Sequence, residues 1–215
     1  MYLCTVKKNE NSAIILANGE FPRNVVLLDK LLRTKTVICC DNAVQNLLDF
    51  GIVPSFIVGD LDSISEKNKT RFSKIIIHDA DQESNDLTKS VKFCIKQGIE
   101  NIEILGATGG REDHTLGNIS LLANYMDDLT SVKMLTDYGV FTPISQTTTF
   151  KSFKNQTVSI FSITPETLIT TENLEYAVKN HNFRSWWEGT LNRSLEEQFT
   201  VAIDSGKIVI FQEYQ

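Results

Sequence analysis

The chain has 215 residues and a formal net charge of −6, with 41% hydrophobic and 22% charged residues. This composition is typical of a globular protein, and no apolar run approaches the roughly 20 residues that a membrane-spanning helix needs. The acidic balance argues against unspecific binding to nucleic acid or to anionic membranes. The first residues show no secretory signal, and the four cysteines form no C-x-x-C pair. We therefore expect a cytoplasmic protein whose cysteines are reduced, structural thiols, namely Cys4, Cys39, Cys40 and Cys94.

The first two-thirds of the chain alternates between short apolar runs and helical patterns. Strands are predicted over residues 13–18, 36–41, 55–60, 74–79, 101–107 and 131–137. Apolar residues recur at helical spacing within 41–51, 85–98 and 116–126. Gly51 and Gly98 stand where the first two of these helices should end. Strands that alternate with such helices indicate a mostly parallel sheet covered on both faces.

The pattern changes after about residue 140. Helical periodicity fades, and segments rich in threonine and serine alternate with apolar ones. Asp204-Ser205-Gly206 lies between two strand-like runs and is typical of a hairpin turn. The predicted fold is therefore a mostly parallel α/β domain over residues 1–139, followed by an antiparallel β-sandwich over residues 140–215.

Four predicted strands run directly into an aspartate, and these are Asp41, Asp60, Asp79 and Asp137. Ligands of open α/β sheets bind at the carboxyl ends of the strands. Asp60 and Asp62 form a D-x-D pair there, which suits a hard divalent cation. The alternative is a capped turn, with Asp62 or Ser63 starting the next helix.

A second acidic segment covers residues 81–86, with the sequence DQESND. It fits a solvated loop that ends in a helix cap at Asn85 or Asp86. It also fits a further metal ligand, Asp86, with Gln82 hydrogen-bonding a ligand.

A glycine-rich segment over residues 105–114, LGATGGREDH, follows a strand and opens a helix. Glycines let the backbone approach a phosphate, and a helix N-terminus offers free N–H groups to an anion. Arg111 supplies a charge that can pair with phosphate. His114 fits either a capping role or a direct role in the site. Because carboxylates and a polyphosphate repel each other, a magnesium ion between them is expected, and the three segments together indicate a metal-dependent nucleotide enzyme.

Three stretches resemble the thiamine pyrophosphokinase family: GIVPSFIVGDLDSIS, DQESNDLTKSVKF and ILGATGGREDHTLGNISLL. The resemblance extends over essentially the whole chain and implies the same two-domain fold. It implies a nucleotide-binding catalytic domain and a C-terminal domain for thiamine binding and dimerisation. It further implies magnesium-dependent transfer of a pyrophosphoryl group from ATP to thiamine, in a homodimer whose active sites lie at the subunit interface.

The same resemblance assigns roles to individual positions. Metal binding falls to Asp60, Asp62 and Asp86, which are catalytic together with Asp113. The residues matched to ATP are Asn18, Thr108, Gly109, Gly110 and Arg111. Those matched to thiamine are Asp41, Gln82, Thr190 and Asn192, to which we add Trp187. Trp187 and its neighbour Trp186 are treated as strand residues that face opposite sides.

The chain departs from the family pattern at two places in the first domain. Asn85 replaces the usual threonine, and Asn42-Ala43 replace the two glycines that usually follow the acid at position 41. Two other classes of function stay open, a different metal-dependent phosphotransferase or phosphohydrolase and a non-catalytic sensor. Release of AMP in proportion to the thiamine consumed would separate pyrophosphoryl transfer to thiamine from the first class. The intact acids at positions 60, 62 and 86 argue against a sensor.

Overall fold

The computed structural model describes residues 11–215, so that Cys4 lies outside the described residues. This part of the chain divides into two compact units, residues 11–121 with 128–137 and residues 122–127 with 138–215. No helix within it combines the length and the apolar character that crossing a bilayer requires.

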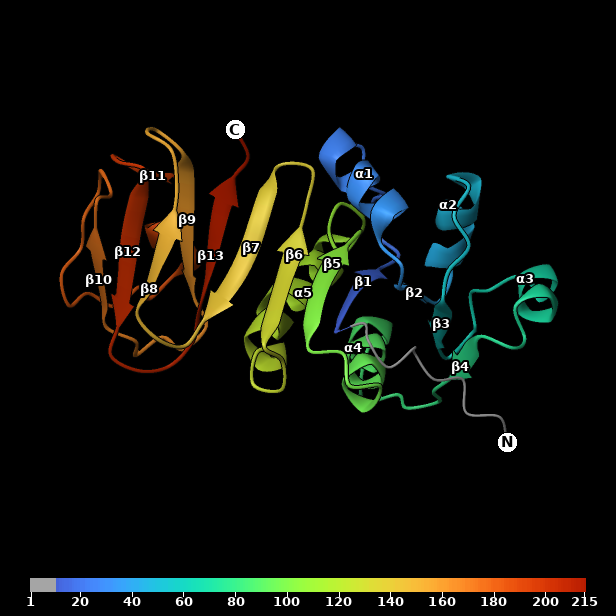
Figure 1. Cartoon of the computed structure of the whole chain (residues 1–215). Coiled ribbons are helices and arrows are strands. Elements are labelled where there is room, and N and C mark those ends of the chain that lie inside the picture. Colours follow the sequence, from blue (N-terminus) through green and yellow to red (C-terminus); the bar gives the residue numbers. More distant parts are fainter. Residues whose placement is uncertain (1–10) are drawn as a thin grey trace. The chain divides into compact units, whose positions relative to one another are not determined.

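The first unit holds six sheet strands, and each pair of neighbours among them is parallel. Their bounds are β1 Ser12–Leu16, β2 Val37–Cys40, β3 Phe56–Gly59, β4 Ile76–His78, β5 Asn101–Leu105 and β6 Ser131–Leu135. The order across the sheet is β6-β5-β1-β2-β3-β4, which is visible in Figure 1. The predicted parallel sheet is thereby confirmed, with each strand somewhat shorter than its apolar run.

Five helices connect these strands. They are α1 Val25–Arg33, α2 Ala43–Asp49, α3 Glu66–Arg71, α4 Asp86–Lys96 and α5 Glu112–Tyr125. Figure 1 shows α1 and α2 on one side of the sheet and α4 on the other. Right-handed crossovers require this arrangement, because the chain moves outward from β1 to β4 and then returns to β5. The reversal makes β1 and β5 the neighbours at which a ligand site is expected.

Local sequence signals explain where these helices begin and end. The side chains of Asn24, Ser65 and Asn85 cap α1, α3 and α4 by accepting a bond from a backbone N–H. Gly51 and Gly98 follow α2 and α4 with φ of 93° and 77°, conformations that favour glycine. Helix α1 lies in a stretch for which the sequence reasoning predicted no element.

The second unit is built from antiparallel strands in two sheets. One has the order β11-β9-β13-β7 and the other the order β10-β12-β8. The bounds are β7 Gly139–Ile144, β8 Thr148–Lys151, β9 Thr157–Ser162, β10 Ile169–Glu172, β11 Asn192–Arg193, β12 Gln198–Ile203 and β13 Ile208–Glu213. Apolar side chains of both sheets form one core, in which the rings of Phe150 and Phe199 stack at 5.2 Å. The predicted sandwich is confirmed.

The predicted hairpin at residues 204–206 is wrong. Strand β12 pairs with β8 and β10, whereas β13 pairs with β7 and β9, so the two strands belong to different sheets. The turn is tied to the segment before β10: Leu168 N donates to Asp204 at 2.9 Å, and Lys207 N donates to Thr164 Oγ1 at 3.2 Å. These bonds hold the turn against the segment before β10. The chain therefore passes from the sheet of β12 to the sheet of β13, and the two strands do not pair as a hairpin.

Candidate functional site

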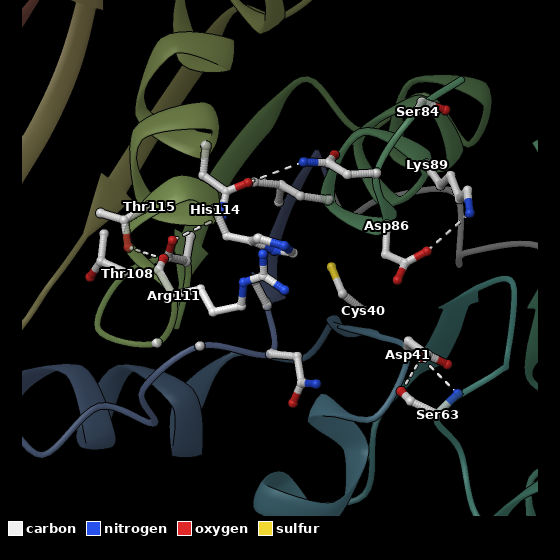
Figure 2. Close-up of a pocket in the computed structure, with 18 of the residues that line it drawn as sticks. Cys40, Asp41, Ser63, Ser84, Asp86, Lys89, Thr108, Arg111, His114 and Thr115 are labelled. Carbon is white, nitrogen blue, oxygen red and sulfur yellow. Dashed lines mark hydrogen bonds and ion pairs between the residues drawn. The ribbon is translucent and has the colours of Figure 1, made fainter. Parts of the chain in front are cut away.

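The first unit contains a pocket of about 400 Å³ at the carboxyl ends of β1, β2, β3 and β5. Its polar lining includes Asn18, Asp41, Asp60, Ser63, Gln82, Ser84, Asn85, Asp86, Lys89, Thr108, Arg111, His114, Thr115 and Asn118. Figure 2 shows Asp41, Asp86 and Lys89 on one side of this pocket and Thr108, Arg111 and His114 on the other. The three sequence segments singled out for chemistry therefore meet in one place.

Three carboxylates gather on the acidic side. Asp41 follows β2, Asp60 follows β3, and Asp86 begins α4, and each offers an oxygen within 4.8 Å of the others. Burial raises the pKa of Asp41, and the nearby charges of Asp86 and Asp60 add to that rise. A backbone hydrogen bond from Asp62 lowers the pKa of Asp60.

Asp41 is held in an unusual position. Only 6% of the residue is exposed, and its φ of 44° lies in the left-handed region. The hydroxyl and the backbone N–H of Ser63 both donate to its Oδ2. Its Oδ1 is buried and has no hydrogen-bond partner. Since a buried oxygen without a partner costs about 1–3 kcal/mol, this oxygen fits a cation ligand, as does the all-oxygen donor set around it.

Lys89 is a site residue that the sequence reasoning missed. It lies one turn after Asp86 on α4, and only 2% of its side chain is exposed. Its Nζ is 3.1 Å from Asp86 Oδ1 and 3.5 Å from Asp60 Oδ2. Burial alone would lower the pKa of Lys89, but the hydrogen bonds and charges of the two aspartates raise it overall. The i, i+3 spacing from Asp86 was the available signal.

Asp62 lies apart from this cluster. It is exposed, it does not line the pocket, and its backbone N–H donates to Asp60 Oδ1 at 3.2 Å. Leu61 has a φ of 69°, so the loop turns sharply between the two aspartates. A sequence spacing of two residues places side chains on one side only where the backbone is extended.

The glycine-rich turn faces the acids from the other strand ends. Gly19 N donates to Gly106 O at 2.7 Å, and Glu20 N donates to Thr108 O at 2.9 Å, which joins this turn to the loop after β1. Thr108, Gly110 and Arg111 line the pocket, whereas Gly109 does not.

The side chain of Asp113 pairs with that of Arg111. Arg111 donates to the carboxylate at 3.1 Å and 2.5 Å, and these bonds lower the pKa of Asp113. Asp113 is exposed and does not line the pocket, so the structure brings it to Arg111 rather than to the acid cluster.

Asn118 links the glycine-rich turn to the acidic side. Its amide donates to Ala107 O at 2.9 Å and accepts from Asn85 at 3.1 Å. Asn85 in turn caps the helix that begins with Asp86, by accepting from Thr88 N at 2.9 Å. His114 lines the pocket, and its backbone N–H donates to Asp113.

The remaining predicted site residues lie in the second unit. Trp186 and Trp187 belong to a 3₁₀ turn, Trp186–Gly189, so their treatment as strand residues is wrong. Trp186 donates to Ser162 O at 3.0 Å and packs against Phe161, whereas Trp187 is 73% exposed.

Thr190 and Asn192 make hydrogen bonds within the second unit. Thr190 donates to Trp187 O at 2.8 Å. Asn192 is buried, and its amide accepts from Tyr176 N and donates to Tyr176 O. These bonds join Asn192, the first residue of β11, to the segment that follows β10.

Gly19→Ala is expected to destabilise the first unit by about 1–3 kcal/mol. A Cβ at this position would lie 2.5 Å from the backbone oxygens of both Gly106 and Thr108, and backbone atoms cannot move aside cheaply. Gly117→Ala on α5 is the matched control, because its Cβ would meet nothing within 4 Å and alanine favours a helix. Urea unfolding measures both, and equal stabilities would contradict the tight contact.

Two family models match the chain. The catalytic domain of thiamin pyrophosphokinase matches residues 28–134, and the substrate-binding domain of thiamin pyrophosphokinase matches residues 139–211. Among curated relatives, "Thiamin pyrophosphokinase 1" of Caenorhabditis elegans is 30% identical over 162 residues, which are 69% of this chain and 66% of the relative. "Thiamine pyrophosphokinase" of Bacillus subtilis is 37% identical over 98 residues, 44% of this chain and 45% of the relative. The aligned stretches thus span less than two thirds of either relative.

Solved structures share the fold over nearly the whole chain. The thiamine pyrophosphokinase of Bacillus subtilis superposes with a TM-score of 0.78 at 20% identity, covering 95% of this chain and 99% of that chain. The thiamin pyrophosphokinase of Candida albicans gives 0.78 at 19% identity, covering 95% and 90%. Because both family models match in sequence order and together cover most of its length, the chain belongs to the thiamin pyrophosphokinase family.

Proposed function

We propose that the protein transfers a pyrophosphoryl group from ATP to the hydroxyl of thiamine, giving thiamine diphosphate and AMP. The observation that carries this proposal is the pocket of the first unit, where three carboxylates lie opposite a glycine-rich turn and Arg111. Acids and a polyphosphate repel each other unless a cation lies between them. Membership of a family of ATP-using enzymes supports the presence of both the polyphosphate and the cation in this pocket.

The proposed cation is Mg²⁺, with Asp60 and Asp86 as ligands. Geometry supports Asp41 as the third carboxylate, because its unpartnered oxygen lies in the same cluster. That Asp62 binds the metal stays a prediction from its D-x-D spacing. When bound, Mg²⁺ would neutralise phosphate charge and align the reacting groups.

The reaction forms a bond between the thiamine hydroxyl oxygen and the β-phosphorus of ATP. The bond from that phosphorus to the oxygen bridging it to the α-phosphorus breaks, AMP leaves, and the hydroxyl proton passes to solvent. In this scheme Thr108, Gly110 and Arg111 hold phosphate oxygens, and Asp113 orients Arg111. Positioning of this kind supplies most of the catalysis in phosphoryl transfer.

We assign ATP binding and catalysis to residues 1–139 and thiamine binding to residues 140–215, with Asn18 and Gly109 on the ATP side. The thiamine contacts proposed are Trp187, Thr190 and Asn192 from residues 140–215, together with Gln82 from the first domain. The exposed indole of Trp187 supports this, because an indole face attracts a cation such as the thiazolium ring by about 0.5–2 kcal/mol. Free thiols at Cys39, Cys40 and Cys94 agree with a reducing, cytoplasmic location.

We further propose a homodimer in which each active site takes residues from both subunits. Mixing an Asp60→Asn chain with a Trp187→Leu chain, and assaying at thiamine concentrations well below the KM of the Trp187→Leu parent, is then expected to restore part of the activity, because one of the two sites in each hybrid keeps both residues. Light scattering and tagged co-purification verify the hybrids. Confirmed hybrids with no activity beyond the parents would place both residues of each site on one chain.

Arg111→Ala is expected to raise the KM for ATP about tenfold and to leave the KM for thiamine nearly unchanged, because a charge-assisted bond to phosphate is lost. Arg33→Ala is the matched control. Arg33 also pairs with an aspartate, Asp29 at 2.8 Å, and is similarly exposed, but it does not line the pocket. Steady-state kinetics with each substrate varied decides, and equal effects on both KM values would contradict a phosphate-specific role.

The experiment that tests the proposed function is incubation of purified protein with ATP, Mg²⁺ and thiamine. Thiamine diphosphate and AMP should form in equal amounts. Release of inorganic phosphate or pyrophosphate without thiamine diphosphate would indicate a phosphohydrolase, and binding without turnover would indicate a sensor.

A further inference from the structure

Lys89 is the one buried cation beside the acid cluster among the residues that the structure describes as lining the pocket. Its ammonium is bonded to Asp86 and lies within ion-pair distance of Asp60. Arg111, the pocket's other permanent cation, has a largely exposed side chain that pairs with Asp113 instead. Lys89, which lies on the same helix as Asp86, is thus the counter-ion of the acid cluster.

The charges make this contact consequential. Three carboxylates within 4.8 Å of one another repel strongly, and partial burial weakens the screening by water. With Lys89 the four groups carry a net charge of −2, which a single divalent cation neutralises. Without Lys89 they would carry −3. Removing one partner of a buried ion pair is costly because the other charge stays behind.

We propose that Lys89 is a positioning residue that holds Asp60 and Asp86 together when no divalent cation is bound, and so keeps the site formed for the metal. The inference deepens the proposed function, because it rests on the acid cluster as a metal site. Lys89 then acts through the two aspartates and need not touch either substrate.

The test compares thermal unfolding of the full chain in EDTA and in saturating Mg²⁺. Lys89→Met keeps the length of the side chain and removes its charge. In EDTA it should lower Tm by about 10 °C. Mg²⁺ should recover at least half of that loss and should raise the Tm of the wild type by less. Lys30→Met is the matched control. Lys30 pairs with Glu103 at 2.6 Å, and neither residue lines the pocket, so the effect of this substitution on Tm should not depend on Mg²⁺.

A double variant keeps the test independent of metal binding. Asp86→Asn combined with Lys89→Met returns the net charge of the cluster to −2, so it should be more stable in EDTA than Lys89→Met alone. If Lys89→Met does not fold in EDTA, recovery of folding in the double variant supports the proposal equally. A double variant no more stable than the single one would overturn it, because Lys89 would then matter only for packing. Rescue by Asp86→Asn without any response to Mg²⁺ would retain the role of Lys89 and refute the proposed metal site.

Discussion

Asp60→Asn and Asp86→Asn are each expected to lower kcat/KM for thiamine diphosphate formation at least about a hundredfold, or roughly 3 kcal/mol of transition-state stabilisation. Both carboxylates lie at the acidic side of the pocket, with oxygens close enough to share one cation. An amide keeps the shape of the side chain and loses the charge. The fold should persist, and part of the loss should reverse at high Mg²⁺.

The matched control is Asp79→Asn. Asp79 also follows a strand of the same sheet, β4, but it does not line the pocket, and its carboxylate accepts from Asp81 N at 3.1 Å. This variant should retain near wild-type activity. Asp62→Asn tests the sequence-based assignment in the same series. Near wild-type activity of Asp60→Asn at low Mg²⁺ would remove the acid cluster from the catalytic machinery.

Much of the first unit was predictable because its signals are local. Buried strands read as apolar runs, and the aspartates that follow them meet at one edge because parallel strands end together. The positions of the strand ends alone therefore predicted that Asp41, Asp60 and the glycine-rich turn meet at one site. Asp86 joined them because Asn85 caps α4 and fixes where that helix begins.

The errors arose where a long-range contact or an unusual backbone decides. The turn at residues 204–206 has the composition of a hairpin, but its partners lie at Thr164 and Leu168, about forty residues earlier. The assignment of Asp62 to the metal is not among these errors and stays a prediction, although the left-handed Leu61 turns the chain between Asp60 and Asp62. The two tryptophans fall in a single 3₁₀ turn that no periodicity could reveal.

Lys89 shows a different limit. A lysine on an amphipathic helix is usually a solvated residue, and nothing in its type announces burial. Its burial follows from the position of α4, which packs against β1, β2 and β3 and turns this side chain toward the strand ends. Only the fold makes its i, i+3 spacing from Asp86 informative.

Asp41→Asn is expected to raise the stability of the fold and to lower the activity. In EDTA at neutral pH the variant should be more stable than the wild type by about 1 kcal/mol. The substitution removes one of three crowded charges, and the new amide can donate to a neighbouring carboxylate where Oδ1 has no partner. Asparagine also tolerates the left-handed φ of 44° at this position.

The pH dependence of this gain has a definite sign. Burial raises the pKa of Asp41 in the folded state, so the folded wild type binds a proton more tightly than the unfolded chain does. The stability of the wild type therefore falls as pH rises from the ordinary aspartate pKa through the raised one. The advantage of Asp41→Asn should be largest above that window and should vanish below it. A constant difference across the window would mean that Asp41 does not titrate in this way.

Activity of Asp41→Asn should fall at least about a hundredfold, and the Mg²⁺ concentration for half-maximal rate should rise. Such opposition between stability and activity is expected where charges are crowded to hold a ligand. The alternative assignment of Asp41 to thiamine predicts another pattern, a raised KM for thiamine at an unchanged Mg²⁺ requirement. Initial rates measured over a grid of Mg²⁺ and thiamine concentrations distinguish the two. A variant that is both more stable and fully active would leave the unpartnered oxygen of Asp41 without a role in the reaction.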